Sequence, residues 1–409
     1  MKRVAVTGMG CVSALGNGVR ETWSSAIAGQ GGARPITLTV EGDRAFTTTA
    51  VVAALRYDPL PALMARFGRK PIIAVDRFAN LAAAATAEAL DEAGLGAGSA
   101  QLRDAAIMWG ACSGGLISIE QAYERMFALG HPNPHPLTVP RLMVSAPASH
   151  ISILFGVRGL CLSISSACAS SAHAIAEGMY LIRSGRAQTV IAGGSDASLS
   201  YGGLQSWKAL QAISEVACRP FSRDRDGTIL GEGAATLILE DEAAARERGA
   251  HILCYLTGAG ATSDASHMTQ PDAESAAAAV RAAHAEAGLP VDEPILISAH
   301  GTGTLLNDRM ETQALREVYG RALDACRVMA TKSAHGHMLG AGGAMEVLLG
   351  VQALIHQEAI PTLNFLDEDS ECPLPLVLGR EAISYRALLS TSFAFGGLNS
   401  ALIAQLPET

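Results

Sequence analysis

Short apolar runs that predict strands alternate with Ala- and Leu-rich stretches at helical spacing, and this alternation occurs twice along the chain. The first series includes strands at 105–109, 160–164 and 189–192, and the second begins near His251. Such alternation is typical of α/β proteins with a largely parallel sheet. A chain of 409 residues is also too long for one simple core. We therefore expect two similar α/β halves, residues 1–250 and 251–409.

The composition excludes several classes of function. Net charge is −9, so no general basic surface is expected and nucleic acid is not an expected partner. The eight cysteines are scattered without a CxxC pair, which argues against a zinc site and favours reduced thiols in the cytoplasm. His131 and His135 lie among prolines, where a plain loop is favoured over a metal site. We find neither a signal-peptide core nor an apolar run of about 18 residues, so no membrane span is expected.

Cys168 is the most informative residue, because it lies on the turn between the strand at 160–164 and a helix at 172–185. The unpaired N–H groups and partial positive charge at a helix N-terminus stabilise a thiolate relative to a thiol. The small neighbouring residues leave room for an acyl group. The competing interpretation is a buried structural cysteine, which is the commonest role of a free cysteine.

Two histidines stand beside glycines at the ends of strands in the second half: His300 before Gly301, and His337 after Gly336. A single histidine at a strand end is more often a satisfied core residue than a catalyst. A cysteine with two histidines and no carboxylate partner predicts thioester chemistry. The thiolate would take an acyl group, and the imidazoles would bind a carbonyl oxygen on which negative charge develops.

Two further patterns have structural interpretations. Gly8 and Gly10 suggest a dinucleotide-binding turn, but the third glycine and the following acidic residue are missing. A tight turn into a helix at 19–28 is the better account. Asp308 and Glu311 open the helix at 309–319 and fit an N-terminal capping pair rather than catalytic carboxylates.

Together these motifs resemble the β-ketoacyl–acyl-carrier-protein synthases of the thiolase-like superfamily, and most of all the synthase I/II type of fatty-acid and type II polyketide synthesis. The resemblance covers essentially the whole chain and implies duplicated βαβαβαββ halves that form a five-layer αβαβα core. It depends on several motifs in order, namely Gly8–Gly10, Ser166–Ser171, Arg219–Phe221 with Asp226-Gly227, Gly231–Ala234, His300–Thr304, Lys332–His337 and Phe393–Asn399.

The resemblance implies a role for each motif residue. Cys168 would be the nucleophile, acylated by the primer from acyl carrier protein. His300 and His337 would hold the malonyl thioester carbonyl and stabilise the enolate formed when carbon dioxide leaves, with their division of labour left open. Lys332 would support the site electrostatically, paired with Glu346.

Other roles follow from the same resemblance. The backbone N–H groups of Cys168 and Phe393 would form the oxyanion hole, and the Phe393 side chain would act as a gate, supported by Phe395 from the same turn. Ser113 lies where family members set the depth of the acyl pocket. No cofactor of its own is implied, since the substrates are carried on the phosphopantetheine of the carrier.

The resemblance also implies partners. Arg66, Arg69 and Lys70 form the densest basic cluster and lie near the family's carrier-docking region, although a solvated loop is the alternative. The chain would form a homodimer, or a heterodimer with a homologous ketosynthase or chain-length-factor subunit.

Three departures from the family pattern point to a specialised synthase, for example one that builds a polyene or aromatic polyketide chain. They are His335 in place of Thr, Ala394 in place of Gly and Leu398 in place of Thr. Three alternatives remain. A thiolase would need a second cysteine in the C-terminal Gly-rich turn, a non-catalytic chain-length factor would lack the nucleophile, and a plain binding protein would not take up acyl groups.

Overall fold

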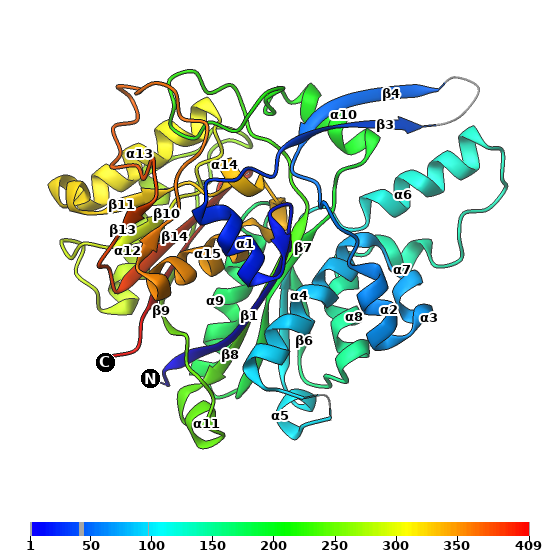
Figure 1. Cartoon of the computed structure of the whole chain (residues 1–409), viewed down its shortest axis with the longest axis horizontal. Coiled ribbons are helices and arrows are strands. Elements are labelled where there is room, and N and C mark those ends of the chain that lie inside the picture. Colours follow the sequence, from blue (N-terminus) through cyan, green and yellow to red (C-terminus); the bar gives the residue numbers. More distant parts are fainter. Residues whose placement is uncertain (1, 41–44, 97, 409) are drawn as a thin grey trace.

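The computed structural model describes residues 2–40, 45–96 and 98–408. Within them, one large sheet of eleven strands runs through the molecule (Figure 1). Its order is β11-β10-β14-β15-β9-β1-β8-β7-β5-β6, with the short β2 paired to β1. The bounds of these strands are β1 Val4–Ser13, β2 Gly16–Asn17, β5 Ala106–Gly110, β6 Cys161–Ile164, β7 Thr189–Asp196, β8 Gly233–Asp241, β9 Cys254–Ser263, β10 Leu296–Ser298, β11 Arg327–Met329, β14 Ala387–Ala394 and β15 Leu398–Gln405.

The strand order confirms the duplication that the sequence predicts. From the centre outward, β1-β8-β7-β5-β6 in one half matches β9-β15-β14-β10-β11 in the other. The pairing directions match as well: β5 is parallel to both β6 and β7, as β10 is to β11 and β14. The first strands of the two halves, β1 and β9, pair antiparallel in the middle, so the sheet passes from one half to the other without a break.

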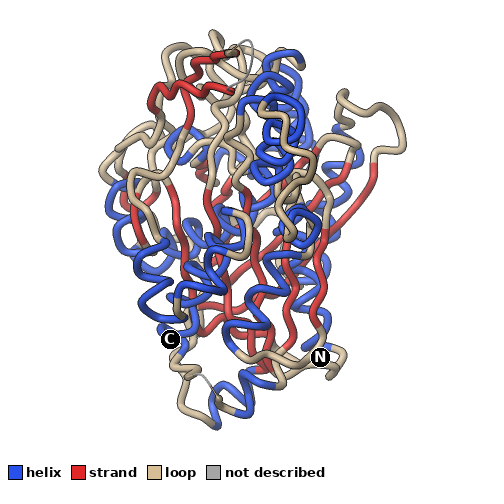
Figure 2. Tube along the Cα trace, turned by 90° about the vertical axis from the view of Figure 1, so that its right-hand side faces the viewer, coloured by secondary structure: helices blue, strands red, loops and turns tan. Residues whose placement is uncertain are grey.

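Helices form layers on both sides of each half-sheet (Figures 1 and 2). α9 (Ser170–Arg183) and α15 (Gly342–His356) lie between the halves and contact strands of both. α4 (Arg77–Ala93) covers the outer face of β1 and β8, while α12 (Ala273–Ala287) covers β9 and β15 with α13 (Leu305–Tyr319) beside it. This is the five-layer α/β arrangement implied by the resemblance.

Further helices and strands complete the fold. They are α1 Val19–Ile27, β3 Arg34–Val40, β4 Phe46–Val52, α2 Leu60–Phe67, α3 Arg69–Ile73, α5 Ala100–Arg103, α6 Leu116–Tyr123, η1 Glu124–Ala128, α7 Thr138–Leu142, α8 Ala146–Phe155, α10 Tyr201–Ala209, α11 Glu242–Glu247, η2 Gly320–Ala325, α14 Lys332–His335, η3 Leu339–Ala341, β12 Glu358–Ala359 and β13 Glu381–Ala382.

Gly8 and Gly10 serve close packing, and the predicted turn at these residues is wrong. β1 continues through them to Ser13. A Cβ on Gly8 would lie 2.2 Å from the Ala89 carbonyl oxygen of α4, and β9 repeats this arrangement, with a Cβ on Gly258 2.2 Å from the Ala283 carbonyl oxygen of α12. The glycines therefore let each outer helix approach the first strand of its half.

The central helix is apolar on all sides because it is enclosed by protein. Residues 342–354 of α15 are buried throughout. By length and composition alone, the segment Leu339–His356 could cross a membrane, but 89% of it is buried inside the structure, as in a core helix.

Candidate active site

Cys168 lies on a strained turn between β6 and α9, where the sequence predicts it. Ala167 adopts a φ of 48°, a left-handed conformation that is uncommon for a residue with a Cβ. The Ser170 hydroxyl holds the turn by donating to the Ala167 carbonyl (2.6 Å) and accepting from the Ser166 N–H (2.9 Å). The turn thus directs the thiol toward the second half of the molecule.

The structure brings Cys168 together with both predicted histidines. Nε2 of His337 lies 3.0 Å from the Cys168 sulfur, and the rings of His300 and His337 meet edge to face with centroids 5.6 Å apart. The two histidines follow the adjacent parallel strands β10 and β11. Parallel strands end at the same edge of a sheet, so residues separated along the sequence converge there.

The thiol and the imidazole are both neutral in the resting protein. Burial raises the pKa of Cys168, and nearby Cys112 raises it further, while Lys332 acts in the opposite direction. Burial also holds the pKa of His337 well below its usual range. Burial thus opposes the stabilisation of the Cys168 thiolate that the helix terminus was expected to give, because a charged sulfur would lose its hydration. The neutral thiol can donate its proton to Nε2 of His337.

Lys332 fixes the tautomer of His300. Its ammonium group lies 3.1 Å from Nδ1 of His300 and donates to the His300 carbonyl oxygen at 2.6 Å. An ammonium only donates, so Nδ1 is the acceptor and the proton of the neutral ring is on Nε2. Burial, followed by the charge of Lys332, keeps the pKa of His300 well below its ordinary value. His300 is thus a neutral N–H donor.

Glu346 forms the buried ion pair with Lys332 that the resemblance implies. Both side chains are essentially fully buried. Burial raises the pKa of Glu346 to about 7, although Lys332 counteracts it. The pair holds the ammonium against His300.

Glu311 supports the backbone of the same histidine, and the predicted capping role is wrong. Its carboxylate accepts hydrogen bonds from the N–H groups of His300 (2.7 Å) and Gly301 (2.8 Å) and from the hydroxyl of Thr391 (2.8 Å). The helix instead begins after Thr304, whose side chain makes no capping bond. Glu311 points inward because the loop after β10 carries N–H groups that the sheet does not pair.

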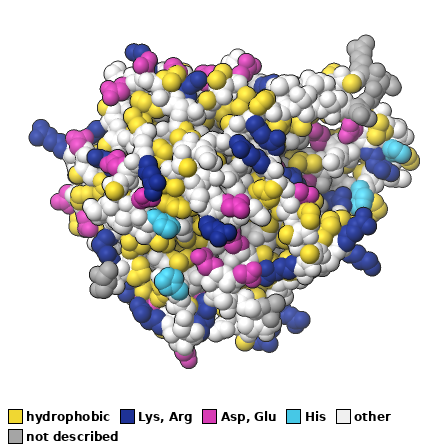
Figure 3. All heavy atoms as spheres, viewed as in Figure 1, with side chains coloured by type: hydrophobic (Ala, Val, Ile, Leu, Met, Phe, Trp, Pro, Cys, Tyr) yellow, Lys and Arg dark blue, Asp and Glu magenta, His cyan; other side chains and the backbone are white. Residues whose placement is uncertain are grey.

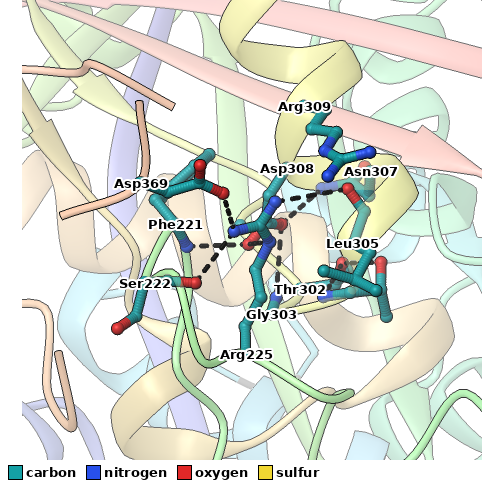
Figure 4. A network of polar contacts seen from close by, with 12 residues as sticks. Phe221, Ser222, Arg225, Thr302, Gly303, Leu305, Asn307, Asp308, Arg309 and Asp369 are labelled. Carbon is teal, nitrogen blue, oxygen red and sulfur yellow. Dashed lines mark hydrogen bonds and ion pairs between the residues drawn. The ribbon is translucent and has the colours of Figure 1, made fainter. Parts of the chain in front are cut away.

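Asp308 belongs to a second network, which ties the loop after β10 to the segment before β8 (Figure 4). It accepts from the N–H groups of Phe221 (2.7 Å) and Gly303 (3.3 Å) and lies 3.6 Å from Arg225. The fully buried guanidinium of Arg225 also bonds Asp369 at 2.5 Å. Burial raises the pKa of Asp308 to about 6. Sequence reasoning missed this network. The charged residues within the Gly-rich segments were the signal that could have predicted buried ion pairs there.

A cavity of about 330 Å³ opens onto the reactive groups. Cys168, His300 and His337 line it, together with Phe393 and Phe395. Phe393 is buried with its ring edge-on to His300, at a centroid distance of 6.3 Å. Phe395 is exposed at the mouth and is followed by two glycines with φ of 85° and 70°, a conformation that favours glycine.

Trp207 of α10 lines the same cavity and was not foreseen. Its ring lies 6.4 Å from that of His337 and 6.0 Å from that of Phe395. No motif or spacing in the sequence marks this tryptophan, because only the fold brings α10 to the edge where the two halves meet.

Other predicted site residues lie away from this cavity. Ser113 is exposed, and its N–H donates to Asp196 (3.4 Å). Arg66 forms a two-pronged ion pair with Asp91, with distances of 2.6 and 2.9 Å, so its charge is partly neutralised. Arg69 and Lys70 are exposed at α3. On the face shown in Figure 3, basic and acidic side chains are interspersed rather than separated by sign.

The three departures from the family pattern have different surroundings. His335 is a satisfied core residue: one ring nitrogen is 3.0 Å from the Thr331 hydroxyl, the other is 2.7 Å from the Gly336 carbonyl, and burial lowers its pKa to about 3. Ala394 and Leu398 face each other across β14 and β15 and pack in the apolar cluster that contains Cys168. Of the three departures, only these two belong to the apolar cluster that contains the nucleophile.

The histidines among prolines lie in an exposed loop, as expected. His135 accepts a hydrogen bond from the N–H of Leu137. In the part of the chain that the structure describes, no cluster of three or more His, Cys, Asp or Glu side chains has an arrangement suited to a metal ion.

A buried thiol facing two neutral imidazoles at the junction of duplicated α/β halves defines a thiol-dependent acyl-transfer site. Two family models match the chain: "Beta-ketoacyl synthase, N-terminal domain" over residues 1–245 and "Beta-ketoacyl synthase, C-terminal domain" over residues 253–366. The chain belongs to the β-ketoacyl synthase family and is a condensing enzyme of the acyltransferase type.

Individual relatives cover nearly the full length. Nodulation protein E of Rhizobium leguminosarum bv. trifolii is 36% identical over 401 residues, 98% of each chain. The 3-oxoacyl-[acyl-carrier-protein] synthase 2 of Coxiella burnetii is 32% identical over 412 residues, again 98% of each. Among solved structures, the ishigamide ketosynthase/chain length factor superimposes with a TM-score of 0.92, at 32% identity and full coverage of both chains.

Proposed function

We propose that this enzyme catalyses the decarboxylative condensation of an acyl group held on Cys168 with a malonyl group carried by acyl carrier protein. The observation that carries the proposal is the contact of 3.0 Å between the Cys168 sulfur and His337, beside a His300 whose tautomer Lys332 fixes. The products are a β-ketoacyl carrier and carbon dioxide.

In the first half-reaction, the acyl group moves from the carrier to the enzyme. Nε2 of His337 accepts the thiol proton of Cys168 as the sulfur attacks the thioester carbonyl. A new C–S bond forms at Cys168, the C–S bond to the carrier breaks, and the proton passes to the departing phosphopantetheine thiolate. Activation at the moment of attack suits a thiol whose pKa burial raises, because no standing thiolate needs to be hydrated.

In the second half-reaction, the malonyl C–C bond breaks and carbon dioxide leaves. The electron pair forms a thioester enolate, whose carbon attacks the acyl carbonyl while the C–S bond to Cys168 breaks. One proton from solvent restores the thiol. Because the carbanion arises by decarboxylation, the site needs hydrogen-bond donors for the enolate oxygen rather than a strong base. Such a donor contributes about 2.7–4 kcal/mol by analogy with oxyanion holes.

The two histidines differ in their supporting contacts, which suggests how they divide the work. His300 is held as an Nε2–H donor by Lys332 and Glu311. Nδ1 of His337 has no hydrogen-bond partner among the described residues, so that ring is free to change tautomer. We assign His300 to enolate stabilisation, and His337 first to proton transfer from Cys168 and then to donation.

We also propose the partners. The exposed Arg69 and Lys70 offer charge for an acidic carrier. β6 is the last strand of the sheet. Leu162 on this strand and Leu160 just before it are exposed, which suits a second copy or a homologous subunit. The likeness to a ketosynthase/chain length factor structure is consistent with either pairing.

A specialised elongation pathway is the finer part of the proposal, supported by Ala394 and Leu398 beside the nucleophile. The alternative is a non-elongating partner subunit similar to a chain-length factor. The contact between Cys168 and His337, with the ring of His300 against that of His337, favours the catalytic role.

Intact-mass measurement of the enzyme with a panel of acyl carriers tests the proposal. We expect the wild type to gain the mass of one acyl group, and Cys168→Ala to gain none. His300→Ala should still be acylated yet fail to release carbon dioxide from malonyl carrier. His335→Thr, a change in a satisfied core histidine of the same segment, is the control and should keep both steps. An enzyme that condenses without Cys168, or at the wild-type rate without His300, would contradict the assignment.

A further inference from the structure

Five aromatic rings form a continuous series along one wall of the cavity. The centroids of neighbouring rings lie between 5.6 and 6.4 Å apart, and the order along the series is Phe393, His300, His337, Trp207 and Phe395. All five residues line the cavity that contains Cys168. The imidazoles and Phe393 serve the proposed reaction. Trp207 has no part in that chemistry, although it supplies the largest flat surface.

The indole is held in place by its helix rather than by a bond of its own. The Ser200 hydroxyl caps α10, and Leu204 anchors the helix in the apolar cluster around Cys168. Lys208 ties it to β4 through the Thr48 hydroxyl (3.0 Å) and the Thr49 carbonyl (2.8 Å). Among the described residues, no group hydrogen-bonds the Trp207 N–H, and the side chain is only half-buried. The part of the side chain that is not enclosed lines the cavity.

We propose that Trp207 is a specificity-determining residue that favours a planar, conjugated acyl group on Cys168 over a saturated chain of the same length. This inference rests on the proposed condensing activity. A flat π-system gains an offset-stacked contact with the indole, whereas a saturated chain gains only the burial of its surface. A conjugated chain is also stiffer, so it loses less conformational freedom when it lies along the wall.

The geometry allows this contact without moving the catalytic groups. Trp207 touches the ring of His337, whose Nε2 is in turn 3.0 Å from the sulfur that carries the acyl group. Trp207 also packs against the apolar cluster that contains Cys168, and both residues line one cavity, so the indole is within reach of the first carbons of that group. Trp207 and Phe395 lie at 31° to each other and already touch, so the chain lies against their surface rather than between them.

A competition experiment tests the inference. Holoenzyme is given 2,4-hexadienoyl and hexanoyl thioesters of the same carrier, and kcat/KM is measured for each in condensation with malonyl carrier. Aromatic stacking predicts a wild-type preference of roughly 2- to 13-fold for the dienoyl group. Trp207→Leu should bring the ratio close to one, and Trp207→Phe should keep most of the preference.

Leu210→Ala is the matched control. Leu210 lines the same cavity, is exposed and has no π-system, so its loss should change both rates by a similar factor. A wild-type enzyme that does not prefer the dienoyl group would overturn the inference, whatever the variants do. A ratio unchanged in Trp207→Leu would also overturn it. Neither result affects the proposed function, which depends on acylation of Cys168 and release of carbon dioxide.

Discussion

Replacing Lys332 by Met removes the group that fixes the tautomer of His300. The ammonium donates to both Nδ1 and the carbonyl oxygen of that residue, at 3.1 and 2.6 Å. Without it, the neutral ring can place its proton on Nδ1 and present no donor to the enolate. Acylation of Cys168 depends on His337 and should continue.

The size of the effect follows from the bonds that are lost. A charge-assisted hydrogen bond contributes about 1.5–3 kcal/mol, which corresponds to a roughly 10- to 150-fold slower condensation. Stability should change as well, because Glu346 is left without its cation. Its pKa is already about 7 with Lys332 present, and it should rise further. A buried carboxyl with a raised pKa stabilises the fold below its unfolded pKa, and this stability is lost as pH rises through the folded value. The variant should therefore be most stable below the ordinary glutamate pKa of 4.5, and it should weaken progressively as pH rises from there past 7.

The assay separates the two half-reactions. Acyl-enzyme formation is followed by intact mass and condensation by release of carbon dioxide, both at pH 6.5, where Glu346 of the variant is protonated. The double variant Lys332→Met/Glu346→Gln removes the lone carboxyl, so it should regain stability at pH 8 but not condensation. The reasoning fails if the single variant condenses normally, or if acylation falls as much as condensation.

Three further outcomes are expected. Burial raises the pKa of Asp196 to about 6, so the stability of the wild type relative to Asp196→Asn should fall by about 2 kcal/mol between pH 4 and pH 7. A flat difference in denaturant titrations would refute this. Gly258→Ala places a Cβ 2.2 Å from a backbone oxygen of α12, and it should lower the free energy of unfolding by at least about 1–3 kcal/mol, as measured by thermal unfolding. The control is Gly249→Ala, whose Cβ would meet open space. Because Gly249 has a φ of 73°, this control should show only the cost of backbone strain. Charge reversal at Arg69 and Lys70 should raise KM for carrier substrates and leave a small thioester mimic unaffected; an equal loss on both would exclude docking there.

Periodicity and motif order were sufficient to predict the duplicated α/β halves and the meeting of Cys168 with two histidines. Strand ends in such a sheet fall at a common edge, so residues at those ends converge whatever the loops do. The roles of Glu311 and Asp308 were misread, because local spacing favours a cap. The choice between a cap and a backbone support depends on which N–H groups the neighbouring loop leaves unpaired.

Sequence by itself determined the layers of the fold, the position of the nucleophile and the class of chemistry, since these follow from local patterns of apolar residues and small turns. Tertiary structure alone decided the protonation of the thiol, the tautomer of His300 and the place of Trp207 beside His337. Each of these depends on how much water is excluded and which groups lie opposite one another. Those quantities arise only when segments that are separate in the sequence pack together, from 32 residues apart for His300 and Lys332 to 169 for Cys168 and His337.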